Sequence, residues 1–204
     1  AVEVAPTAAA TPAVHKLGLY LPGFYETTPV VLHGRLLLVE CIHDGRPMLA
    51  SPAAAASEPF QNHTYYRVRE PGYGGKLIVP VVPQSVGFHF VSALVIPDAH
   101  AEGGEALWVF GTVDPPLGGG PHGRTQIFAW ASHDSELRHW NRTLALQLPP
   151  GYSAWNTDVA PAGGNGSYVM AIELQAPSSV VGVPFSTAFA VCDGCGSDLS
   201  GGWR

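Results

Sequence analysis

A short apolar hairpin recurs along this 204-residue chain, and the recurrence constrains the fold more than any other feature. Each unit opens with a small hydroxyl residue that leads an apolar run, and Thr28, Ser92 and Thr157 begin these runs at intervals of 64 and 65 residues. A turn that contains glycine and a second apolar run follow each time. Even spacing of one supersecondary unit indicates a repeat architecture, in which neighbouring units bury one another's apolar faces.

A second marker has nearly the same period. The expected strands are residues 28–32, 36–40 and 65–68 in the first unit, 92–96, 107–112 and 127–132 in the second, and 157–160, 168–174 and 185–191 in the third. Segments 132–140 and 197–203 share Ser, Asp, Leu and Trp, and Trp140 and Trp203 are 63 residues apart. A Ser/Asp pair can close a turn while the tryptophan covers the space between sheets. The two markers favour an all-β β-propeller, with a β-sandwich of coincidental spacing as the alternative.

Composition excludes several classes of fold and partner. The 24 glycines and 19 prolines are scattered along the chain, which argues against long helices, and only 13% of residues are charged whereas 46% are hydrophobic. The net charge is −6 and no Lys/Arg cluster occurs, so we expect no nucleic-acid partner. No apolar run approaches the ~20 residues that a membrane-spanning helix needs, so we expect no membrane span.

Three of the four asparagines begin sequons for N-linked glycans. These are Asn62, Asn141 and Asn165, each of which falls at a predicted turn. So many sequons among so few asparagines favours a secreted or extracellular glycoprotein carrying N-linked glycans, with coincidence as the alternative.

The three cysteines are an odd number. Cys192 and Cys195 form a Cys-x-x-Cys without a second such pair, and we expect a local disulfide within a turn. Cys41 would then be unpaired, or paired with something outside these residues. The histidines occur singly and no phosphate-binding glycine loop is present, so we expect neither a metal nor a cofactor.

The arrangement resembles the five-bladed propellers of family 43 glycoside hydrolases, which include arabinanases and β-xylosidases. The likeness rests on a Ser-x-Asp-Leu-x-x-Trp-like element in each blade, matched here by Asp134, Leu137 and Trp140 in one unit and by Asp198, Leu199 and Trp203 in the next. The resemblance implies antiparallel four-stranded blades around a central channel.

The repeat also suggests a division of the chain. Residues 1–16 are rich in Ala, Pro and Thr and are expected to form an extended or disordered lead-in, and residues 17–85, 86–152 and 153–204 are expected to form three blades. Three blades are too few for a closed five-bladed ring, and an open array exposes apolar faces. We therefore expect a longer polypeptide, or a further chain or subunit, to complete the propeller.

The resemblance implies a catalytic site of acidic residues on successive inner strands. Asp158, at the head of the third inner strand, matches the Asp that modulates a pKa in the family. The first blade departs from the family pattern because Thr28 stands where a base Asp would precede Pro29, and the nearest carboxylate is Glu26. Strand alternation would place Glu26 on the same face as Thr28, where it would point into the channel. The alternative is that Glu26 lies in an exposed loop. The family's general acid would lie beyond Arg204.

Four further residues are candidates for binding substrate. Glu40 and Glu173 end apolar strands, where a carboxylate either binds sugar hydroxyls at the channel rim or simply reaches solvent. Trp155 either stacks on a sugar ring or packs in the core, and His89 leads into the second inner strand.

Two functions from different classes follow. The first is a secreted glycoside hydrolase-like propeller that acts on or binds polysaccharide through its channel. The second is a noncatalytic extracellular glycoprotein that binds carbohydrate or packs into a cell-surface assembly, because a fold does not decide a function.

Overall fold

Three antiparallel sheets make up the protein in a computed structural model that describes residues 24–43, 64–71, 75–113, 125–163, 166–175 and 185–204. The first sheet contains β1 (Phe24–Leu32), β2 (Arg35–His43), β3 (Thr64–Arg69) and β4 (Leu77–Val79). The second contains β5 (Phe88–Pro97), β6 (Glu105–Val113), β7 (Gln126–Ser132) and β8 (Asn141–Gln147). The third contains β9 (Ser153–Pro161), β10 (Tyr168–Gln175) and β11 (Ser186–Cys192).

The fold is all-β, as the sequence predicts. A one-turn 3-10 segment at Glu102–Gly104 is the only helical element in the described part of the chain. No helix within the described ranges is long and apolar enough to cross a bilayer. The expected lead-in, residues 1–16, lies outside the described residues.

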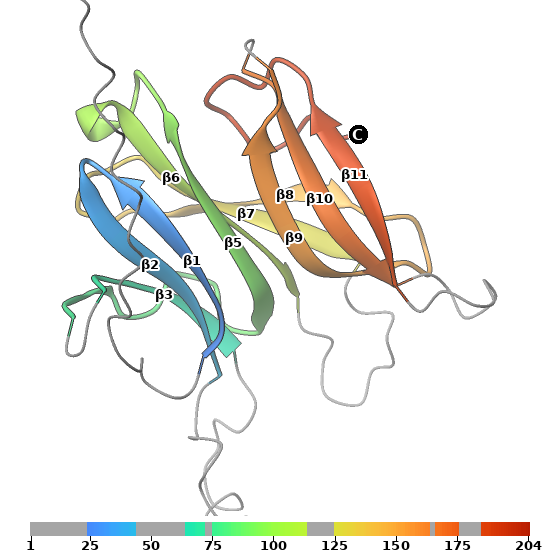
Figure 1. Ribbon diagram of the computed structural model, residues 1–204, viewed down its shortest axis with the longest axis horizontal. Coiled ribbons are helices and arrows are strands. Elements are labelled where there is room, and N and C mark those ends of the chain that lie inside the picture. The colour runs from blue at the N-terminus through green and yellow to red at the C-terminus, as the bar shows by residue number, and fades with distance from the viewer. Residues whose placement is uncertain (1–23, 44–63, 72–74, 114–124, 164–165, 176–184) are drawn as a thin grey trace, which may run out of the picture.

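Each sheet is a meander in which neighbours in sequence are neighbours in space. The first strand of each sheet lies beside the first strand of the next, so that β1, β5 and β9 run side by side and point the same way (Figure 1). The hydroxyl of Thr28 on β1 donates to the carbonyl of Val91 on β5, and Ser92 on β5 lies 3.4 Å from Thr157 on β9, hydroxyl to hydroxyl. All nine strands expected from the repeat are present. The described residues form three sheets, whereas the alternative fold, a two-layer β-sandwich, has two.

The third sheet differs from the predicted four-stranded form. It has three strands within the described residues, in the order β9, β10 and β11. Arg204 nevertheless exchanges two backbone hydrogen bonds with Val191 on β11. This pairing repeats that of Asn141 with Ala131 in the second sheet, and both residues follow directly on the repeated tryptophan.

The middle sheet is buried on both faces. Along β6, Trp108 and Phe110 belong to the core between the second and third sheets, whereas Leu107 and Val109 belong to the core between the first and second. Side chains alternate across a strand, so each apolar neighbour serves a different core. This explains why the apolar run of β6 is uninterrupted. A strand covered on one face only would alternate apolar and polar residues.

Aromatic rings hold both sheet interfaces. Trp130 of the second sheet is fully buried and meets Tyr66 of the first edge-on, with ring centroids 5.2 Å apart. On the other side, Trp203 packs edge-on against Phe110 at 6.1 Å. Edge-to-face pairs at such distances add about 0.5–1.5 kcal/mol beyond their area burial. The predicted role of Trp203, to cover the space between neighbouring sheets, is confirmed.

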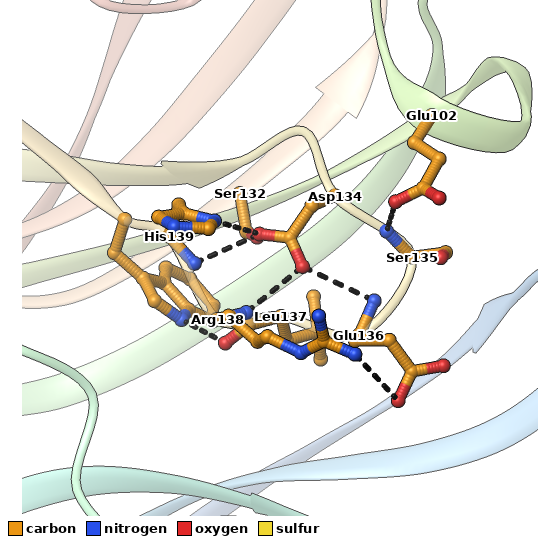
Figure 2. A network of polar contacts seen from close by, with 9 residues as sticks. Glu102, Ser132, Asp134, Ser135, Glu136, Leu137, Arg138 and His139 are labelled. Atoms are coloured by element: carbon orange, nitrogen blue, oxygen red, sulfur yellow. Dashed lines mark hydrogen bonds and ion pairs between the residues drawn. The ribbon is translucent and has the colours of Figure 1, made fainter.

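The repeated Ser/Asp element forms a turn closed by a carboxylate (Figure 2). Asp134 accepts hydrogen bonds from the backbone N–H groups of Glu136, Arg138 and His139, and from the hydroxyl of Ser132. Burial opposes ionisation of this carboxyl, but the hydrogen bonds and nearby His139 outweigh it and lower its pKa. The predicted turn role of Asp134 is therefore confirmed.

The same geometry recurs one unit later. Asp198 accepts the backbone N–H of Ser200, as Asp134 does for Glu136. The indole N–H of Trp140 donates to the carbonyl of Leu137, and that of Trp203 donates to the carbonyl of Leu199. The repeat thus extends from spacing in the sequence to individual hydrogen bonds.

We predict that Gly111→Ala destabilises the fold. A methyl carbon there would overlap the buried phenol of Tyr66 and approach the carbonyl oxygen of His89 to 3.0 Å. Overpacking of this kind costs about 1–3 kcal/mol, measurable by urea denaturation. Gly201→Ala is the control, because nothing lies within 4 Å of the added carbon. Equal losses from both substitutions would contradict the prediction.

We also predict that Asp134→Ala lowers the free energy of unfolding by about 1–3 kcal/mol, since three backbone N–H groups lose a charged acceptor. The lowered pKa means that this stabilisation is present above the ordinary value of 3.8 and is lost as the pH falls through the folded-state pKa. Glu136→Gln, on the exposed side of the same turn, is the control and should change little. A deficit for Asp134→Ala that persists in strong acid would count against this explanation.

Candidate functional site

The N-terminal ends of the three inner strands carry most of the residues that the sequence singled out. Glu26 is near the start of β1, His89 near the start of β5, and Trp155 near the start of β9. Because β1, β5 and β9 lie side by side and point the same way (Figure 1), their starts face the same end of the molecule. This end is the candidate functional site.

Glu26 is the most perturbed acid of the site. The backbone N–H of Val91 donates to its carboxyl group, whereas Oε2 is buried without a hydrogen-bond partner among the described residues. Burial raises the pKa of Glu26 to about 7, and the negative charge of Glu173 adds to the rise while the Val91 bond opposes it. A carboxyl group that keeps its proton near neutral pH is suited to donate one.

Tyr66 supports the site from the third strand of the first sheet. Its hydroxyl donates to the backbone carbonyl of His89 over 2.6 Å, which ties β3 to the start of β5. Gly111 lies directly against this hydroxyl and leaves it room. Burial, followed by the nearby Cys41 and Glu26, raises the pKa of Tyr66 well above its ordinary value, so the phenol stays protonated.

Glu173 supplies a second carboxylate within electrostatic range of Glu26. It lies on β10, half-buried, and Oε2 accepts a hydrogen bond from the side-chain amide of Asn156 on β9. One carboxyl group is thus desolvated and the other is hydrogen-bonded by an amide.

The surroundings of Asp158 differ from those of Glu26. The side chain of Asp158 is exposed, and it alternates with Thr157, whose hydroxyl lies toward Ser92 on β5. Asp158 is opposite Ala171 in the pairing of β9 with β10, one register position from Ile172 and two from Glu173. The structure therefore places Asp158 on the open face of the third sheet, together with Asn156.

The remaining binding candidates have their own contacts. His89 is half-buried at the start of β5. The indole N–H of Trp155 donates to the side-chain oxygen of Gln175, and its ring meets Phe185 edge-on at 5.5 Å. Trp155 therefore packs within the third sheet while staying partly exposed.

Glu40 does not reach solvent, which corrects the simpler of its two interpretations. Its side chain is fully buried in the first sheet, where Oε2 accepts a hydrogen bond from Nε of Arg67 at 2.6 Å. Because this carboxylate is buried and paired with Arg67, it is not exposed to bind a substrate from solvent, and we assign Glu40 a structural role.

The glycosylation and disulfide predictions are only partly covered by the structure. Asn141 is exposed at the first position of β8, whereas Asn62 and Asn165 lie outside the described residues. Cys192 and Cys195 are at disulfide distance, with Cα atoms 5.8 Å apart. Cys41 is buried, with Sγ 3.9 Å from the carbonyl oxygen of Phe88.

Sequence reasoning missed Tyr66 as part of this site. The one available signal was Gly111, since a glycine inside an otherwise apolar strand indicates that something approaches the backbone closely. Nothing in the sequence showed that the approaching group is a phenol from another sheet, because Tyr66 and Gly111 meet only through the packing of the first sheet on the second.

Comparisons with known proteins return no match. Neither a protein family, nor a curated protein, nor a solved structure matches this chain.

We predict that Glu26→Gln stabilises the protein in a pH-dependent way. Between the ordinary value of 4.5 and the folded-state pKa of about 7, the native state holds the proton more tightly than the unfolded chain does. Native stability therefore falls as the pH rises through this window, and the neutral amide avoids the loss. Thermal melts should show a higher Tm for the variant at about pH 8 and little difference at about pH 4.

Glu70→Gln serves as the control for this experiment. Glu70 pairs with Arg35 at a partly exposed position, 3.1 Å between Oε1 and Nη2, so the substitution should bring no gain at high pH. A Glu26→Gln effect of equal size at both pH values would show that the carboxyl group does not titrate as described.

Proposed function

We propose that this protein is a secreted, propeller-type carbohydrate-active protein of the glycoside hydrolase kind, with its site at the starts of β1, β5 and β9. The fold supports the proposal, because it consists of three meandering sheets whose first strands, β1, β5 and β9, lie side by side. The innermost strands of propeller blades are arranged in this way around the central channel. The repeated Asp turn and Leu–Trp hydrogen bond further agree with the resemblance to family 43.

The observation that carries the proposal is the buried carboxyl group of Glu26, on which the charge of a second carboxylate, Glu173, acts. Hydrolysis of a glycosidic bond needs one carboxyl group that donates a proton and another that activates water or attacks. Glu26, whose pKa is raised, takes the role of proton donor. Glu173 is the second carboxylate in this proposal, and Asp158 lies exposed two register positions from it on the third sheet.

This assignment changes the role that the resemblance implied for Glu26. A residue in the place of the family's base would need to be ionised at working pH, whereas burial keeps most of Glu26 protonated below about pH 7. The proton donor is thereby supplied within these residues, and His89 and Trp155 border the site as contacts for substrate. Polysaccharide is the proposed substrate class, and no cofactor is involved in such a reaction.

The experiment is an assay on linear arabinan, xylan and the corresponding aryl glycosides. Glu26→Gln should lower kcat by about 100-fold or more, the usual contribution of a general acid. In the unchanged protein, the rate should fall as the pH rises above about 7, because Glu26 then loses its proton. Glu173→Gln should also lower kcat, and Glu70→Gln should not.

A noncatalytic glycoprotein is the second candidate, and exposed aromatic side chains favour it. Phe189 on β11 is 67% exposed, and Phe185, directly before β11, is 41% exposed although its ring meets that of Trp155. Aromatic groups on an open sheet suit a partner chain or further blade. Full activity of Glu26→Gln would overturn the hydrolase proposal, and polysaccharide binding without any hydrolysis would leave this second candidate.

A further inference from the structure

A cavity of about 490 Å³ lies at the other end of the inner strands. Its lining includes Asp98 after β5, His133 after β7, and Asp198 and Ser200 after β11. Val91, the partner of Glu26, lies seven residues before Asp98, which corresponds to about 23 Å along an extended strand. The cavity is therefore separate from the site described above, and its volume is within the ~300–1,000 Å³ typical of small-molecule sites.

An imidazole held by a buried carboxylate marks this cavity. Oδ2 of Asp98, whose side chain is 3% exposed, lies 2.8 Å from Nδ1 of His133, and Oδ1 accepts the backbone N–H of His100. Burial opposes ionisation of Asp98, but these hydrogen bonds outweigh it and keep its pKa below the ordinary value. Bonding at Nδ1 orients the ring and leaves Nε2 of His133 for a ligand.

The polar groups around the imidazole are mixed donors and acceptors. Asp198 accepts the backbone N–H of Ser200 at Oδ1 and lies close enough to His133 for its charge to interact with the ring. Thr143, which carries a hydroxyl group, lines the same cavity. Trp108 adds an aromatic wall and meets the His133 ring edge-on at 6.0 Å.

This combination favours a neutral hydroxylated ligand over a charged one. Two carboxylates repel phosphate and other anions, while the oxygens of Asp98 are already satisfied by the chain and attract a cation less strongly. No group of three or more His, Cys, Asp or Glu side chains spaced for a metal ion occurs in the described part of the chain. A hydroxyl both donates and accepts, so a ring that bears several hydroxyls matches the mixed lining.

We propose that the cavity between the second and third sheets, marked by His133 and Asp198, binds a single neutral sugar ring. His133 and Asp198 contact its hydroxyl groups and Trp108 supplies the apolar wall. The inference does not depend on Glu26, because the two sites lie at opposite ends of β5.

The test is a titration of the folded protein with D-glucose, D-xylose, L-arabinose and N-acetylglucosamine, followed by NMR of the histidine rings. At least one sugar should shift the His133 signals with a Kd on the order of 1 mM. His133→Gln and Asp198→Asn should each weaken binding at least about tenfold, as expected when a ligand hydroxyl loses its hydrogen-bond partner in a partly buried site. Amide spectra of each variant establish that it is folded, and Ser200→Ala serves as a milder variant.

His139→Gln is the matched control, since His139 lies six residues after His133 in the same connection, with its side chain 87% exposed, and does not line the cavity. It should leave the Kd unchanged. The proposal is overturned if no sugar shifts His133 at about 100 mM, if folded cavity variants bind as well as the unchanged protein, or if methylammonium or phosphate binds more tightly than every sugar.

Discussion

The burial of the second sheet between its two neighbours is the constraint on which the structure depends. Leu107 and Val109 point into one core and Trp108 and Phe110 into the other, so the strand has no solvent-facing side. A sheet with two apolar faces is stable only when both are covered, which requires that a further sheet lie on each side. The alignment of β1, β5 and β9 (Figure 1) follows from this stacking.

Both candidate sites result from the same stacking. At one end of β5, the packing of the first sheet on the second buries Glu26 and removes water from its carboxyl group, which raises its pKa. At the other end, the turns after β7 and β11 spread around Asp98 and His133 and leave a cavity. Close packing along the strands, with chemistry at their ends, is the usual division of roles in a β-sheet protein, because polar groups meet solvent only where the cores stop.

The open faces of the outer sheets show where the stacking stops within the described residues. Phe189 and Phe185 are exposed on the third sheet, and Val31 and Leu36 on the first. Apolar side chains in such exposed positions lose contact with water only when another surface packs over them. These side chains are exposed within the described residues, and the need for further blades or a partner chain stays a prediction.

The sequence by itself determined the strands, their hairpins and the repeat, because alternation, turn residues and the Leu–Trp element are local signals. It also indicated the turn role of Asp134, whose partners lie within five residues. Only the tertiary structure decided the surroundings of the acids. Glu40 is buried beside Arg67, Glu26 is desolvated near Glu173, and Asp158 is exposed. Burial and charge at these positions come from residues on other strands, and no local pattern records which strand lies opposite.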